Sequence, residues 1–168
     1  MKKIFFVGLV FAGILFSGCT AKHSLVFNED YKPKENTKIE LNEVSNKTSQ
    51  KFELDVEQML KEALNKKLDV ENMLWANEKN SKLQLNVYIL EYSEGDAFKR
   101  WLMPGWGATV LAVEATLKDN DQIVGKANAS RNIAAGGGYT IGAWKYVYDD
   151  IAADLISDLK KHVASNDK

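Results

Sequence analysis

The sequence predicts an α+β fold, a two-layer sandwich of order β-α-β-β-β-α with two helices packed on one face of a four-stranded, mostly antiparallel sheet. Two periodicities support this prediction. Apolar and polar residues alternate over 83–89 and 109–117, as in strands with one buried face. Apolar residues recur at spacings of three and four over 52–68 and 141–163, as in helices with one buried stripe. Helices and sheet each need an apolar partner, and a two-layer packing provides it.

The individual elements follow from these periodicities and from the turn-forming residues between them. In chain order we expect a strand over 38–44, a helix from about 49 to 67, strands over 83–89, 109–117 and 122–132, and a helix over 140–163. The core should form between inward sheet residues and the helix stripes, namely Leu85, Val87, Leu111 and Val113 against Leu60, Leu64, Ile151 and Leu155.

The N-terminal segment has the order of a lipoprotein signal peptide. Two lysines precede the apolar run 4–16, and two small residues precede Cys19, the only cysteine of the chain. The apolar run is too short for a stable membrane span, which needs about 20 residues. Because 16–19 resembles a lipobox, we expect residues 1–18 to be removed and Cys19 to be lipidated. An ordinary signal peptide with a chance cysteine is the alternative.

The residues after the cleavage position indicate location and domain limits. Thr20 rather than Asp follows Cys19, and by resemblance to enterobacterial sorting this favours the outer membrane, with the domain in the periplasm. Residues 19–36 are polar with little periodicity, so we expect a lipidated tether there. Residues 37–165 are then expected to form a single periplasmic domain.

Composition and residue placement argue against several function classes. The net charge is −1 and there is no basic tract, which argues against a nucleic-acid partner. His23 falls in the expected tether and His162 at the end of the final helix, so neither is placed as a general base. No residue cluster has metal-ligand spacing. We therefore expect no enzyme activity, no cofactor and no metal. The acidic row Asp150, Asp154 and Asp158 is interpreted as a solvated helix face.

Two segments between regular elements have unusual compositions. The segment 99–107, expected to be a loop, contains two of the four tryptophans, and 134–142 contains a glycine run. In a meander both segments meet at one end of the sheet. They either cap the core or form a surface that meets a partner. A glycine cradle for an anion is a third possibility. The candidate partner-binding residues are Arg100, Trp101, Met103, Trp106, Gly136, Gly137, Gly138 and Tyr139.

At these residues the sequence resembles a known family. Arg100 to Gly105, then 113–119, then the glycines 136–138 and the helix that contains Ala152 resemble the domain-of-unknown-function family 4410, over roughly 83–159. The family consists of small lipoproteins and exported proteins of Gram-negative bacteria. The resemblance implies no activity, because none is assigned to the family.

These observations lead to one expected function and two alternatives. We expect a non-enzymatic outer-membrane lipoprotein whose periplasmic domain binds another envelope component in an assembly or scaffold role. One alternative is a homo-oligomeric ring subunit of an envelope complex that pairs through exposed sheet edges. The other is a lipid- or glycan-binding module that uses the Trp101 and Trp106 loop.

Overall fold

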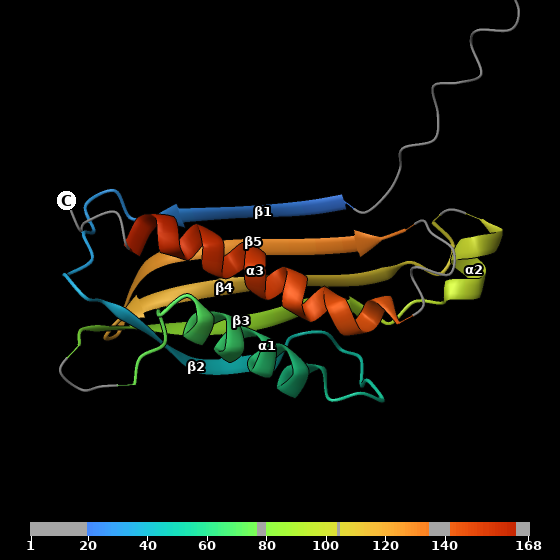
Figure 1. Ribbon diagram of the computed structural model, residues 1–168, viewed down its shortest axis with the longest axis horizontal. Helices are drawn as coiled ribbons and strands as arrows, with labels where there is room; N and C mark the ends of the chain where they lie inside the picture. Colours follow the sequence, from blue (N-terminus) through green and yellow to red (C-terminus); the bar gives the residue numbers. More distant parts are fainter. Residues whose placement is uncertain (1–19, 77–79, 104, 135–141, 164–168) are drawn as a thin grey trace, which may run out of the picture.

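The computed structural model describes residues 20–76, 80–103, 105–134 and 142–163 (Figure 1). In chain order, the elements in these residues are β1 (Thr20–Phe27), β2 (Lys38–Asn46), α1 (Val56–Val70), β3 (Lys82–Ser93), α2 (Ala97–Leu102), β4 (Thr109–Asp119), β5 (Gln122–Ile133) and α3 (Ala143–Val163).

The strands form one five-stranded sheet in the order β1-β5-β4-β3-β2. Strands β2 and β3 are parallel, because α1 crosses over between them, and the other neighbours are antiparallel. Helices α1 and α3 lie side by side over one face of the sheet (Figure 1). The predicted two-layer α+β sandwich is therefore confirmed, whereas the predicted strand number is wrong by one. The sheet is mixed and includes an additional edge strand, β1.

Strand β1 occupies residues that we expected to be a tether. It pairs antiparallel with β5 along its whole length, from Thr20 opposite Asn132 to Phe27 opposite Gly125. The alternation of apolar and polar residues is hard to recognise in the sequence of β1, because the inward position 23 holds a histidine. Its Nδ1 lies 2.5 Å from Oδ2 of Asp158 on α3. The polar side chain is accommodated under the helix by a polar partner, so hydrophobicity alone did not predict the strand.

The core lies between the sheet and the two helices, as the periodicities predicted. The predicted core residues are all buried there, namely Leu60, Leu64, Leu85, Val87, Leu111, Val113, Ile151 and Leu155. Helix α1 begins later than expected, because the Asp55 carboxylate accepts a hydrogen bond from the backbone N–H of Gln58 at 3.0 Å and caps the helix at Val56. The first residues expected in the last helix, 140 and 141, lie outside the described residues.

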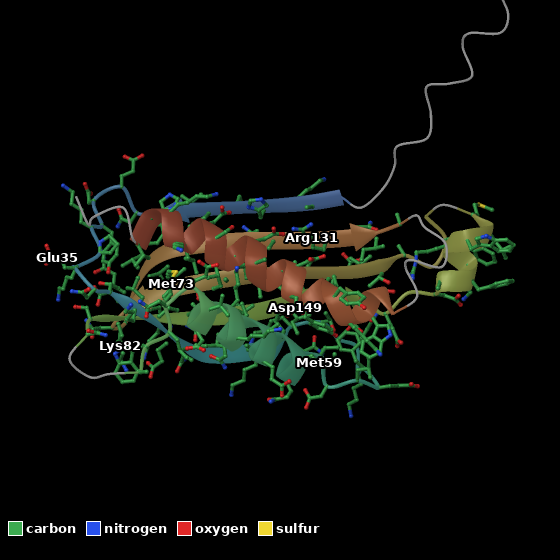
Figure 2. All side chains as sticks on the ribbon, viewed as in Figure 1. Glu35, Met59, Met73, Lys82, Arg131 and Asp149 are labelled. Carbon is green, nitrogen blue, oxygen red and sulfur yellow. The ribbon has the colours of Figure 1, made fainter. Side chains whose placement is uncertain are left out.

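Two of the three residues of the acidic row of α3, Asp154 and Asp158, are not solvated as we had interpreted them. Arg131 on β5, labelled in Figure 2, donates from Nε and Nη2 to the two carboxylate oxygens of Asp154, at 2.7 and 2.6 Å. Asp158 lies against His23 and also accepts from Nζ of Lys161 at 2.9 Å. Burial raises the pKa of the Asp158 carboxyl, but these two partners outweigh burial and hold the pKa below its ordinary value. The interpretation failed because β1 and β5 place polar side chains under this part of α3.

Candidate functional site

The segment between β3 and β4 forms a short helix, α2, where a loop was expected. Its N-terminus is capped by Asp96, whose Oδ1 accepts from the backbone N–H groups of Phe98 and Lys99 at 2.9 and 3.1 Å. The bond from the Lys99 N–H lowers the pKa of the Asp96 carboxyl; partial burial opposes this effect, and the Phe98 N–H and the Lys99 side chain reinforce it. The backbone N–H of Asp96 also donates to the carbonyl of Gly107 at 2.8 Å and closes the base of the segment.

Arg100 holds α2 onto the end of the sheet. Its side chain is buried, and Nη1 donates to the carbonyl of Gly107 at 2.7 Å and to Oγ1 of Thr109 at 2.9 Å. The Thr109 hydroxyl in turn donates to the carbonyl of Glu94 at 2.7 Å. Gly95, with φ of 75°, leaves room for this network, because a Cβ there would lie 2.5 Å from Nη1 of Arg100. Arg100, predicted as a partner contact, is therefore turned inward and positions the segment.

Five large apolar side chains of this segment face solvent. We call them the end patch, and its members are Phe98, Trp101, Leu102, Met103 and Trp106. Trp101 is 65% exposed and Trp106 is 49% exposed. The rings of Phe98 and Trp101 lie 6.0 Å apart, and Nζ of Lys99 lies 5.9 Å from the centroid of Trp106. The tryptophans therefore lie at the surface and do not cap the core. Exposed apolar patches of this kind mark interaction sites.

The predicted meeting of the two unusual segments is observed for Ala134, the first residue of the segment 134–142. The backbone N–H of Gly105 donates to the carbonyl of Ala134 at 2.6 Å. Gly136, Gly137, Gly138 and Tyr139 lie outside the described residues, as does Cys19. Sequence analysis missed Asp96, Gly95 and Thr109. Together with Arg100 and Gly107 they form the base under the end patch, which we call the platform. The Asp ahead of an apolar run was the available signal for the helix cap.

The uncovered face of the sheet has a shallow hollow of about 300 Å³. It is lined by residues of β1, β3, β4 and β5, namely Lys22, His23, Ser24, Leu90, Ala112, Val113, Asn128, Ala129 and Ser130. Among them, the ring of His23 contacts Asp158 of α3 on the covered face. Among the residues that the structure describes, no group of three His, Cys, Asp or Glu side chains is placed to hold a metal ion. Nor is any helix in this part of the chain long and apolar enough to cross a membrane.

The geometry defines a two-layer α+β domain that presents the exposed end patch on a segment held by the hydrogen bonds of Asp96 and Arg100. By sequence, the chain belongs to the family named domain of unknown function DUF4410, whose model matches residues 26–137. The resemblance found in the sequence is thereby confirmed. Its extent was wrong, since the match begins within β1 and ends before α3.

The fold is also similar to that of PelC from Paraburkholderia phytofirmans, which was solved as a dodecamer. One PelC structure superposes with a TM-score of 0.51 at 16% identity, covering 82% of this chain and 96% of PelC. A single-substitution variant of PelC, also a dodecamer, gives a TM-score of 0.50 at 14% identity, with 81% and 97% covered. At these identities the likeness shows the fold alone. A search of curated proteins found no match to the sequence.

Proposed function

We propose that this chain is a non-enzymatic lipoprotein of the bacterial outer membrane whose periplasmic domain binds another envelope component through the end patch. The observation on which the proposal depends is the exposure of Trp101, Trp106 and their apolar neighbours on a fixed platform. Tryptophan and methionine are enriched in interfaces, whereas surface loops are normally polar. An assembly or scaffold role fits a domain whose most unusual surface is apolar rather than reactive.

The energetics of the end patch support a binding role. The five side chains of the end patch are about half to two thirds exposed in the free domain, so covering the rest of each contributes roughly half of the 1.5–3 kcal/mol that full burial gives, or about 4–8 kcal/mol for all five. This contribution offsets the lower part of the cost of association, which is about 4–15 kcal/mol. The hydrogen bonds of Arg100 and Asp96 hold the platform before any partner arrives, so little further ordering is needed on binding.

The two histidines of the described domain are engaged in packing between layers, which supports a non-enzymatic role. His23 lies against Asp158, and the ring of His162 stacks on Phe27 with centroids 5.2 Å apart. Neither histidine lies next to the end patch, because His162 is in the last turn of α3 and His23 contacts Asp158 near that turn, and this end of α3 is opposite to α2 (Figure 1). A general base at the patch would have to come from another kind of side chain.

Lipid attachment is tested by Cys19→Ala in the full chain. We expect the variant to lose palmitate labelling and to leave the membrane fraction or remain unprocessed, because the thiol accepts the lipid. Palmitate incorporation that persists in Cys19→Ala refutes the anchor. Separation of inner and outer membranes on a density gradient then tests the location of the unaltered protein.

Binding through the end patch is tested by a photo-crosslinking amino acid at position 101 or 106 in living cells. The matched control places the same residue at Ile123, which is 46% exposed but lies at the start of β5, at the opposite end of the sheet. We expect crosslinked products from 101 and 106 and none from 123. Equal crosslinking at all three positions contradicts a specific surface. Melting temperatures near that of the unaltered protein show that the variants fold.

A ring subunit is a second candidate, favoured by the position of β1. This strand lies at the edge of the sheet, where one row of backbone N–H and C=O groups faces outward and can pair with another copy. The similar fold of PelC, which forms dodecamers, is compatible with such an assembly. Light scattering on the protein that begins at Thr20 measures its mass. A discrete multiple of the monomer mass supports a ring, and a monomer at high concentration contradicts it.

A further inference from the structure

We infer that the partner of the end patch is the lipid bilayer that holds Cys19, so that the domain rests on its own membrane by the α2 end. This inference rests on the proposed lipidation of Cys19. It names the chemistry of the surface that the end patch meets, namely phospholipid headgroups and the adjoining acyl chains.

The first argument is the position of Thr20, where the described domain begins. In the sheet, Thr20 is opposite Asn132 on β5, and Asn132 is opposite Val110 on β4. Adjacent strands are about 4.8 Å apart, so the start of β1 lies roughly 10 Å across the sheet from the start of β4. The α2 segment leads directly into β4 at that same end. Figure 1 shows β1 starting at the end of the sheet from which α2 projects.

The second argument is the absence of a spacer between the lipid and the sheet. Cys19 immediately precedes Thr20, and consecutive Cα atoms are about 3.8 Å apart. A tether of 19–36, as first expected, would have let the domain take any orientation. With β1 paired from Thr20 onward, the described domain begins at the end of the sheet that carries the end patch. A protein that covered the end patch would have to fit between this end and the bilayer.

The third argument is the side-chain chemistry of this end. Tryptophan prefers the boundary between headgroups and acyl chains, and Phe, Leu and Met enter the apolar layer below it. The first turn of α3 adds Trp144, Lys145 and the 62%-exposed Tyr146. This turn lies at the same end, because Tyr148 stacks on Tyr92 near the end of β3, with centroids 5.9 Å apart.

Charged side chains are present at both ends of the sheet. At the α2 end the carboxylate of Asp96 lies 3.6 Å from Nζ of Lys99, so its charge is compensated. The opposite end has charged and polar turns, including 28–36 and the hairpin 119–122. Glu35 and Lys82, labelled in Figure 2, lie at that end, away from α2. The polar segment 47–55 follows β2 on the α2 side of the sheet, because β2 is parallel to β3, so the exposed apolar side chains and not the charges distinguish the two ends.

The test uses the lipidated mature protein in vesicles of phosphatidylethanolamine and phosphatidylglycerol that contain brominated acyl chains, which quench nearby indoles. In the test protein Trp75, Trp106 and Trp144 are replaced by Phe, so that Trp101 is the only tryptophan. In the matched control Trp101 is also replaced by Phe, and Ile123→Trp places an exposed indole at the opposite end. We expect several-fold stronger quenching and a blue-shifted emission for the test protein. A second protein that retains only Trp106 repeats the measurement at the other indole.

The outcomes separate this inference from the function on which it rests. Mass spectrometry of the N-terminal peptide shows whether Cys19 is lipidated. A lipidated, vesicle-bound protein whose Trp101 and Trp106 are quenched no more than the control overturns the membrane contact and leaves the lipoprotein proposal intact. A protein without lipid on Cys19 refutes the proposed anchor itself, and the membrane contact falls with it. Circular dichroism confirms that each variant is folded.

Discussion

The ion pair between Arg131 and Asp154 gives the sharpest test of the packing of α3 on the sheet. We expect Asp154→Asn to destabilise the domain, because the variant leaves a largely buried guanidinium beside a neutral amide. The two charge-assisted hydrogen bonds, 2.7 and 2.6 Å long, are lost or weakened together. The matched control is Asp149→Asn on the same helix, because Asp149 is exposed and its carboxylate lies 4.0 Å from Nζ of Lys66.

The expected loss of stability follows from how deeply the ion pair between Arg131 and Asp154 is buried. Removing one partner of a buried ion pair costs about 3–5 kcal/mol. The side chain of Arg131 is 23% exposed, and water can therefore solvate part of its charge. We expect a loss of about 2–3 kcal/mol in the free energy of unfolding for Asp154→Asn, and less than about 0.5 kcal/mol for Asp149→Asn. For a domain of about 150 residues the first value corresponds to a melting temperature lower by roughly 5–10 °C.

Urea and thermal unfolding followed by circular dichroism measure both variants at pH 7. The double variant Arg131→Met with Asp154→Leu should recover most of the loss, since an apolar pair removes both charges and the cost of taking them out of water. If Asp154→Asn has the same melting temperature as Asp149→Asn, the ion pair between Arg131 and Asp154 does not stabilise the packing of α3 on β5. The reasoning is then refuted.

Two further predictions concern the core and the contact between the helices. Leu111→Ala or Leu155→Ala should each lower the free energy of unfolding by about 2–5 kcal/mol, because both side chains are buried between sheet and helices. Urea unfolding measures this loss, and a loss under about 0.5 kcal/mol at both positions would contradict this packing. Glu71 accepts from Lys160 on α3 and from Lys67, and these bonds lower its pKa from 4.5 to about 2. Because the folded pKa is the lower one, its stabilisation is complete above about pH 4.5 and is lost as the pH falls towards 2. The difference in melting temperature between the unaltered protein and Glu71→Gln should therefore shrink over that window, and a difference that stays constant would show that the ion pairs do not contribute.

Alternation and helical periodicity predicted most of the fold because the central strands and both long helices obey them with apolar residues. Strands β3 and β4 contribute Leu85, Val87, Leu111 and Val113 to the core, and each is flanked by a residue of the other face. Such segments specify their own conformation and face. For these elements the sequence pattern and the packing agree, and only the boundaries shifted.

The features that escaped prediction, namely strand β1 and the inward acidic side chains of α3, involve inward side chains that are polar. In β1 the inward position of His23, and in α3 those of Asp154 and Asp158, look solvated when each segment is considered alone. Their partners lie far away in the sequence, so no local pattern shows that a pair forms. The platform under α2 escaped for a similar reason, since the role of Arg100 depends on Thr109 and on the space above Gly95. The unusual composition of 99–107 did indicate a special surface.

Strand β1 is the first part of the described domain to be synthesised, yet its partner β5 lies about a hundred residues further along the chain. The other strand pairs join segments that are closer in sequence, and β4 and β5 form a hairpin. Closing the longest loop costs the most chain entropy, which favours docking of β1 onto a sheet whose other ladders have already formed. In hydrogen-exchange measurements during refolding, the backbone amide hydrogens of β1 should then become protected last. The order of synthesis and the order of folding would run in opposite directions at this edge of the sheet.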